Sequence, residues 1–150
     1  ERQQAESLAK KVVHISEFVA RSSEHPPMAN TGGTTKRVTY HSSCHLRAAG
    51  VTKEPRQVLS SLPGVNFVEM QDADRCAGGA GTYVVKDYDT SKKIFERKAR
   101  AINQSGANVV ATSCPACMIQ LKNGLDDAVE VKHVAQLLQE AYRAAEDEKS

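Results

Sequence analysis

Four cysteines are the residues of this chain best suited to chemistry. Cys44, Cys76, Cys114 and Cys117 are its only cysteines, and the last two enclose a Cys-Pro-Ala-Cys motif. Thiolates bind soft metals, which in proteins points to zinc or to the iron of an iron–sulfur cluster. A CxxC pair can bring two thiolates to one metal. The other two cysteines are distant in sequence, with 31 residues between Cys44 and Cys76, so a shared site depends on the fold.

The elements around the cysteines predict a fold that brings them together. Strands are expected at 37–41, 65–71, 108–112 and 129–132, and helices at 53–62, 87–104, 115–124 and 133–145, the third of these closed by Gly124 as a cap. Strand followed by helix, four times over, predicts an α/β fold: a small Rossmann-like parallel sheet of about four strands with helices on both faces. Cys44, Cys76 and Cys114 each follow a predicted strand. Because ligands of such sheets lie beyond the carboxyl ends of the strands, we expect all four thiols at one edge.

The N-terminal segment differs in pattern from the rest of the chain. Apolar residues recur at three- and four-residue steps over 3–22, which predicts one amphipathic helix, and a Pro- and Gly-containing loop follows over 21–35. We therefore expect 1–35 to be a helix and linker that pack on the body, and 36–150 to be a single domain. The chain begins at Glu1 without a signal peptide, and we interpret it as part of a larger protein.

Composition excludes several classes of function. Hydrophobic residues make up 40% and charged residues 25%, as in soluble globular domains. No apolar run is long enough for a transmembrane helix. The formal charge is +2, with no basic stripe and few aromatic residues, so a nucleic-acid surface is not expected. Four cysteines are too few for a disulfide scaffold, which favours a reducing, cytoplasmic location.

Other interpretations of these residues stay open at this point. The CxxC alone could be a thioredoxin-like dithiol, and the four cysteines could be unrelated small core residues. The glycine-rich segment 76–83 could hold phosphate, although it lacks the GxGxxG spacing and a Walker lysine. His41 and His45 flank Cys44 and could ligate metal or hydrogen-bond a cluster sulfur, and His45 could instead face solvent. His14 and His133 are expected to pack or to cap helices.

Three segments together resemble a known family, the cysteine-rich CCG domain. They are Tyr40-His41-Ser42-Ser43-Cys44-His45-Leu46, Cys76-Ala77-Gly78-Gly79-Ala80-Gly81-Thr82-Tyr83 and Cys114-Pro115-Ala116-Cys117. The family has one cysteine, a Cys-Cys-Gly triplet and a CxxC pair in that order, and both spacings here fit. The similarity runs from about Glu17 to Leu138.

The resemblance implies an iron–sulfur electron-transfer domain, here the C-terminal repeat. The domain occurs in heterodisulfide reductases and in iron–sulfur subunits of FAD-linked enzymes that oxidise glycolate or lactate. It implies a [4Fe-4S] cluster on Cys44, Cys76, Cys114 and Cys117, with FAD on a partner domain or subunit, a ferredoxin-like domain nearby, and association of the complex with the inner face of a membrane through its partners. The fragment alone is expected to be inactive. The alternatives are a zinc-binding structural or docking module and a thiol–disulfide (heterodisulfide) reductase.

One position departs from the family pattern. Ala77 stands where the triplet has its second cysteine. With four thiols, the site is expected to hold an ordinary [4Fe-4S] cluster, a zinc ion or a labile centre instead of the unusual cluster of the five-cysteine members. The departure favours electron relay or a structural role over disulfide reduction.

Overall fold

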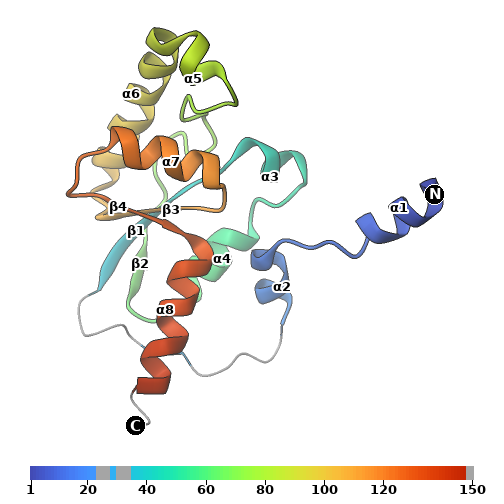
Figure 1. Cartoon of the computed structure of the whole chain (residues 1–150). Coiled ribbons are helices and arrows are strands. Elements are labelled where there is room, and N and C mark those ends of the chain that lie inside the picture. The colour runs from blue at the N-terminus through green and yellow to red at the C-terminus, as the bar shows by residue number, and fades with distance from the viewer. Residues whose placement is uncertain (23–27, 30–34, 148–150) are drawn as a thin grey trace.

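A four-stranded parallel sheet forms the centre of the chain (Figure 1). The structure is a computed structural model that describes residues 1–22, 28–29 and 35–147. The strand order is β2-β1-β3-β4. The strands are β1 (Lys36–His41), β2 (Val65–Phe67), β3 (Val109–Thr112) and β4 (Glu130–His133). The predicted α/β class and the parallel sheet are confirmed.

Helices cover both faces of the sheet, as predicted. On one face α2 (Ile15–Arg21), α4 (Glu54–Ser61) and α8 (Val134–Asp147) pack against Val109 and Ala111 of β3. On the other, α6 (Tyr88–Ser105) and α7 (Pro115–Gly124) pack against Val110, because successive side chains of a strand point to opposite faces. Two apolar cores result, one on each face of the sheet.

The N-terminal segment is not one helix. It divides into α1 (Arg2–Ala9) and α2, with Lys10–His14 between them. α2 contacts α4 and α8, whereas α1 has no buried residue and points away from the body (Figure 1). A separate N-cap starts α2: His14 Nδ1 accepts from the Ser16 amide at 3.2 Å, which confirms a capping role. His133 caps α8 similarly, with Nδ1 accepting from the Ala135 amide at 3.1 Å. Most of the predicted 21–35 loop lies outside the described residues.

Some other boundaries were wrong. β2 ends at Phe67, not at 71, because it pairs only with β1 and the chain then leaves the sheet. Two short helices were missed, α3 (Cys44–Ala48) and α5 (Tyr83–Lys86). Gly124 is the last residue of α7 and not its cap. An added Cβ there would lie 2.3 Å from Phe95 Cε1, so glycine allows α7 to approach α6 closely. In the described part of the chain, no helix is long and apolar enough to cross a membrane.

Candidate metal centre

All four cysteines line one cavity of about 260 Å³ at the carboxyl edge of the sheet. Cys44 is the first residue of α3, directly after β1. Cys114 is the N-cap of α7 after β3, and Cys117 lies in the first turn of that helix. Cys76 lies on the long connection between β2 and α5. The fold therefore gathers thiols from three separate strand ends, as the positions beyond the strands predict.

The thiols differ in burial. Cys44 and Cys76 are exposed, Cys114 is buried and Cys117 is partly buried, and all four are free thiols. Burial, followed by the charge and hydrogen bond of Cys114 and by the other two cysteines, raises the pKa of Cys117 well above its usual range. The metal-free site therefore keeps a proton on Cys117 at neutral pH, and binding of a metal there must release it. Two exposed thiols also argue against four unrelated core cysteines.

The spacing of the donors bears on the kind of metal that they could hold. Four thiolates around one zinc ion would lie about 3.8 Å apart, given Zn–S bonds of about 2.3 Å. Within the described residues, no three His, Cys, Asp or Glu side chains are set to ligate a single ion. In an iron–sulfur cubane each thiolate binds a different iron atom, which allows wider spacing. The donor set of four thiols around a cavity of this size fits such a cluster.

The turn after Cys76 is packed between two helices. The Gly78 amide donates to Cys76 Sγ at 3.2 Å, and Ser91 Oγ of α6 donates to the Gly78 carbonyl at 2.9 Å. Gly78 has φ +85°, and an added Cβ would lie 2.5 Å from the Ser91 carbonyl oxygen. At Gly79 an added Cβ would lie 2.9 Å from Gln120 Cβ of α7. Small residues at these two positions therefore allow α6 and α7 to approach the turn, and Gly79 also lines the cavity of the four cysteines.

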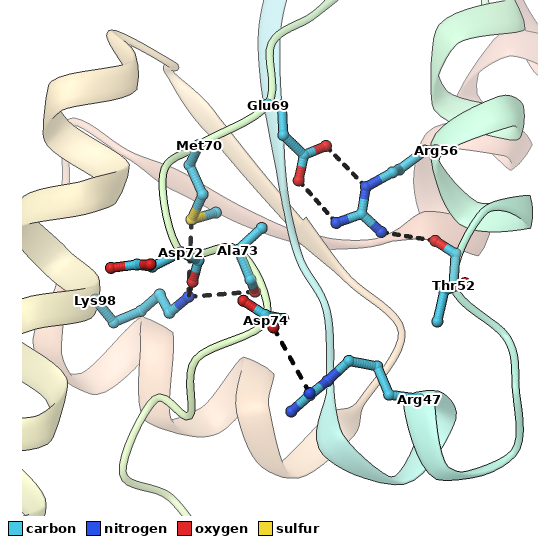
Figure 2. A network of polar contacts seen from close by, with 9 residues as sticks. All are labelled: Arg47, Thr52, Arg56, Glu69, Met70, Asp72, Ala73, Asp74 and Lys98. Carbon is cyan, nitrogen blue, oxygen red and sulfur yellow. Dashed lines mark hydrogen bonds and ion pairs between the residues drawn. The ribbon is translucent and has the colours of Figure 1, made fainter.

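The turn before Cys76 is held by a network of polar contacts (Figure 2). Lys98 Nζ of α6 donates to the Asp72 carbonyl at 2.6 Å and to the Ala73 carbonyl at 3.2 Å. The Ala73 carbonyl also accepts from the Ser42 amide at 3.0 Å, which joins this turn to the segment before Cys44. Nearer to β2, the Arg56 guanidinium of α4 donates two hydrogen bonds to the Glu69 carboxylate, at 2.8 and 2.7 Å.

His41 and His45 occupy different positions around the cavity. His45 is exposed at its rim, whereas His41 is 1% exposed and its Nδ1 is buried without a hydrogen-bond partner in the described structure. Burial, followed by the charges of Lys98 and Arg47, lowers the pKa of His41 to about 3, so its ring is neutral at neutral pH. Buried hydroxyls at the ends of β1 and β3 also lack partners among the described residues. They belong to Thr39, Ser42, Ser43 and Thr112.

Lys98 is the residue of this region that the sequence analysis missed. It lies on the buried face of α6 with Ser91, Phe95, Ala101 and Ile102. The available signal was a lysine at an apolar position of an amphipathic helix, which usually indicates a buried charge with a specific partner.

Comparison with known proteins agrees with this geometry. The family model described as "Cysteine-rich domain" (CCG) matches residues 38–122. A probable glycolate oxidase iron–sulfur subunit of Bacillus subtilis is 41% identical over 72% of the chain and 26% of its own length. A subunit of the dihydromethanophenazine:CoB–CoM heterodisulfide reductase from Methanosarcina acetivorans is 35% identical over 91% of the chain and 35% of its own length.

A third relative, lactate utilization protein A of Bacillus subtilis, is 30% identical over 89% of the chain and 57% of its own length. The chain thus spans between about a quarter and somewhat over half of these relatives. The match over 38–122 includes all four cysteines and the three strand ends that carry them. The chain belongs to the family of cysteine-rich CCG domains.

Proposed function

We propose that this chain holds one [4Fe-4S] cluster through Cys44, Cys76, Cys114 and Cys117 and relays electrons in a larger oxidoreductase. The observation that carries the proposal is that four thiols from three strand ends line one cavity. The relatives support it, because they include an iron–sulfur subunit of a probable glycolate oxidase and a subunit of a heterodisulfide reductase. The cluster would supply one-electron transfer, and the protein would hold and tune it.

The chain's own groups have distinct roles in this proposal. The four thiolates hold the iron, and the Gly78 amide donates to the sulfur of Cys76, which stabilises its negative charge. The two apolar cores keep the strand ends in place whether or not the site is filled. We treat residues 36–150 as the domain. Its sheet therefore holds the four cysteines in place before a cluster binds.

The larger assembly follows from the resemblance to these relatives. We propose that an FAD-linked dehydrogenase domain or subunit oxidises a 2-hydroxy acid such as glycolate or lactate, and that a ferredoxin-like domain lies on the same electron path. The complex would be cytoplasmic and associate with the membrane through its partners.

Metal analysis of anaerobically reconstituted protein tests the ligand set. We expect iron and sulfide in a cubane ratio and a brown protein, and strong loss of both in each of the four Cys→Ser variants. His45→Asn, at the exposed rim of the same cavity, is the matched control and should keep full occupancy. Zinc without sulfide in a colourless protein would favour the structural zinc module. Full occupancy in Cys44→Ser or Cys76→Ser, with loss in a CxxC variant, would exclude the four-ligand model.

Position 77 allows a second test. Ala77 is 1% exposed and lines the cavity with the cysteines, so Ala77→Cys would add a fifth thiol there. The change adds one sulfur atom, at a packing cost of about 1 kcal/mol. After reconstitution the variant should change the electron paramagnetic resonance spectrum of the reduced or oxidised centre, whereas the parent should show only a cubane signal. Identical spectra and iron contents would mean that position 77 does not bind the metal.

A further inference from the structure

Lys98 is a buried cation without a carboxylate partner. Its residue exposure is 2%, and Nζ contacts two backbone carbonyls and, at 4.0 Å, the sulfur of Met70 (Figure 2). Among the described residues, no carboxylate oxygen lies within ion-pair distance of Nζ. A buried ammonium group is costly unless a negative charge compensates it. Nζ contacts carbonyl oxygens and a thioether sulfur directly, and the charges of Asp74 and Asp72 act on it only from beyond ion-pair distance.

Lys98 contacts the turn that leads into Cys76. Its two carbonyl partners belong to the turn 72–76, in which Asp72 has a positive φ of 55° and the Arg75 amide donates to the Asp72 carbonyl at 3.0 Å. Lys98 and Cys76 line one cavity of about 210 Å³. Cys76 also lines the cavity of the four cysteines. The cavity lined by Lys98 and the cavity of the four cysteines therefore adjoin at Cys76.

The two carboxylates nearest to Lys98 in the turn are paired with arginines and do not form an ion pair with it. Asp72 Oδ2 lies 3.2 Å from Arg75 Nε, and Asp74 Oδ2 lies 3.9 Å from Arg47 Nη1, so each carboxylate is shared with an exposed arginine. His41 and Arg47, which also act on this region, add no negative charge. A cluster on four thiolates carries net negative charge and gains one more on reduction. A filled cysteine site would therefore add negative charge on the far side of Cys76 from Lys98, which favours its cationic form together with Asp74 and Asp72.

We propose that Lys98 is a positioning residue for the metal centre: it holds the turn that presents Cys76, and its buried charge stabilises the reduced state and raises the midpoint potential. The proposal rests on the function proposed above. A positive charge stabilises the more negative redox state, so removal of that charge should shift the potential to more negative values. A lysine that only ties down the turn would change stability and leave the potential of a fully loaded site unchanged.

Three variants separate the charge from the packing. Lys98→Met removes the charge and the donors at similar length, and Lys98→Arg keeps both. Lys93→Met removes the same charge from an exposed position of α6 and is the matched control. Each anaerobically loaded protein is assayed for iron and sulfide and titrated with redox mediators. We expect a more negative potential only for Lys98→Met, and the parental potential for Lys98→Arg and Lys93→Met.

Each outcome decides the proposal. A fully loaded Lys98→Met with the parental potential overturns the electrostatic role. If Lys98→Met does not load, recovery of loading and of the parental potential in Lys98→Arg supports the proposal, whereas failure of both variants shows that the exact lysine packing matters and overturns it. A parent that takes up no iron refutes the proposed function instead. In that case the alkylation rate of Cys76 relative to Cys44 in the apo proteins tests the turn, and an unchanged ratio in Lys98→Met overturns that role as well.

Discussion

Substitution of Gly78 by alanine, which adds one methyl group, tests whether close packing requires glycine in this turn. Gly78 and Gly50 have nearly the same backbone conformation, with φ values of +85° and +81°. Alanine at either position adopts a left-handed conformation, which costs about 1–2 kcal/mol. The two sites differ in space: nothing lies within 4 Å of an added Cβ at Gly50, whereas at Gly78 the Ser91 carbonyl oxygen lies at 2.5 Å.

The difference between the two variants isolates the steric contact. Backbone cannot rotate away as a side chain can, so Gly78→Ala must displace either the turn or the first turns of α6. Such overpacking typically costs about 1–3 kcal/mol more. We expect a loss of about 2–5 kcal/mol in the free energy of unfolding for Gly78→Ala and of about 1–2 kcal/mol for Gly50→Ala. Because Cys76 precedes the glycine by two residues and accepts its amide, metal loading should fall in Gly78→Ala only.

Urea denaturation of both apo variants, together with iron analysis after reconstitution, measures these effects. Parallel transitions with unchanged slope would confirm that only stability differs. Equal losses of stability in the two variants would refute the contact with α6 as the reason for glycine. Full iron occupancy in Gly78→Ala would refute the claim that this turn presents Cys76.

Three further predictions concern the rest of the domain. The folded state binds fewer protons at His41 than the unfolded state between the unfolded pKa of 6.5 and the folded value of about 3, so apo stability falls as pH falls through this window. Between about pH 7 and about pH 4, the free energy of unfolding should therefore fall by about 3 kcal/mol less in His41→Asn than in the parent. Urea titrations at the two pH values measure this, and equal losses in both proteins would contradict the lowered pKa of His41. Leu59→Ala, at a fully buried position of α4, should lower the free energy of unfolding by about 2–5 kcal/mol, and a smaller loss would mean that the cavity collapses. Removal of the metal should leave the helical circular dichroism signal intact, since both cores form without it; its collapse would indicate a metal-dependent fold.

The sequence by itself determined the order of the elements and the grouping of the cysteines. The strands at β1, β3 and β4 and the helix at 115–124 agree with the predicted ranges to within about one residue, because their apolar patterns are decided locally. A parallel sheet then brings every strand's carboxyl end to one edge. Cys44, Cys76 and Cys114 could therefore be assigned to one site although 31 and 37 residues separate them.

Tertiary contacts determined some element boundaries and the burial of individual residues, which a local sequence pattern does not predict. The apolar period over 3–22 predicted one helix, but only α2 finds a surface to pack on, and α1 stays without buried residues. β2 ends before the predicted residue 71 because it is an edge strand that pairs only with β1. The need for glycine at Gly78 depends on the carbonyl of Ser91, which is 13 residues away in sequence. The sequence places Lys98 on the apolar face of α6, but the packing of α6 against the turn at Asp72 decides which groups its buried ammonium contacts, because those groups lie on a distant segment.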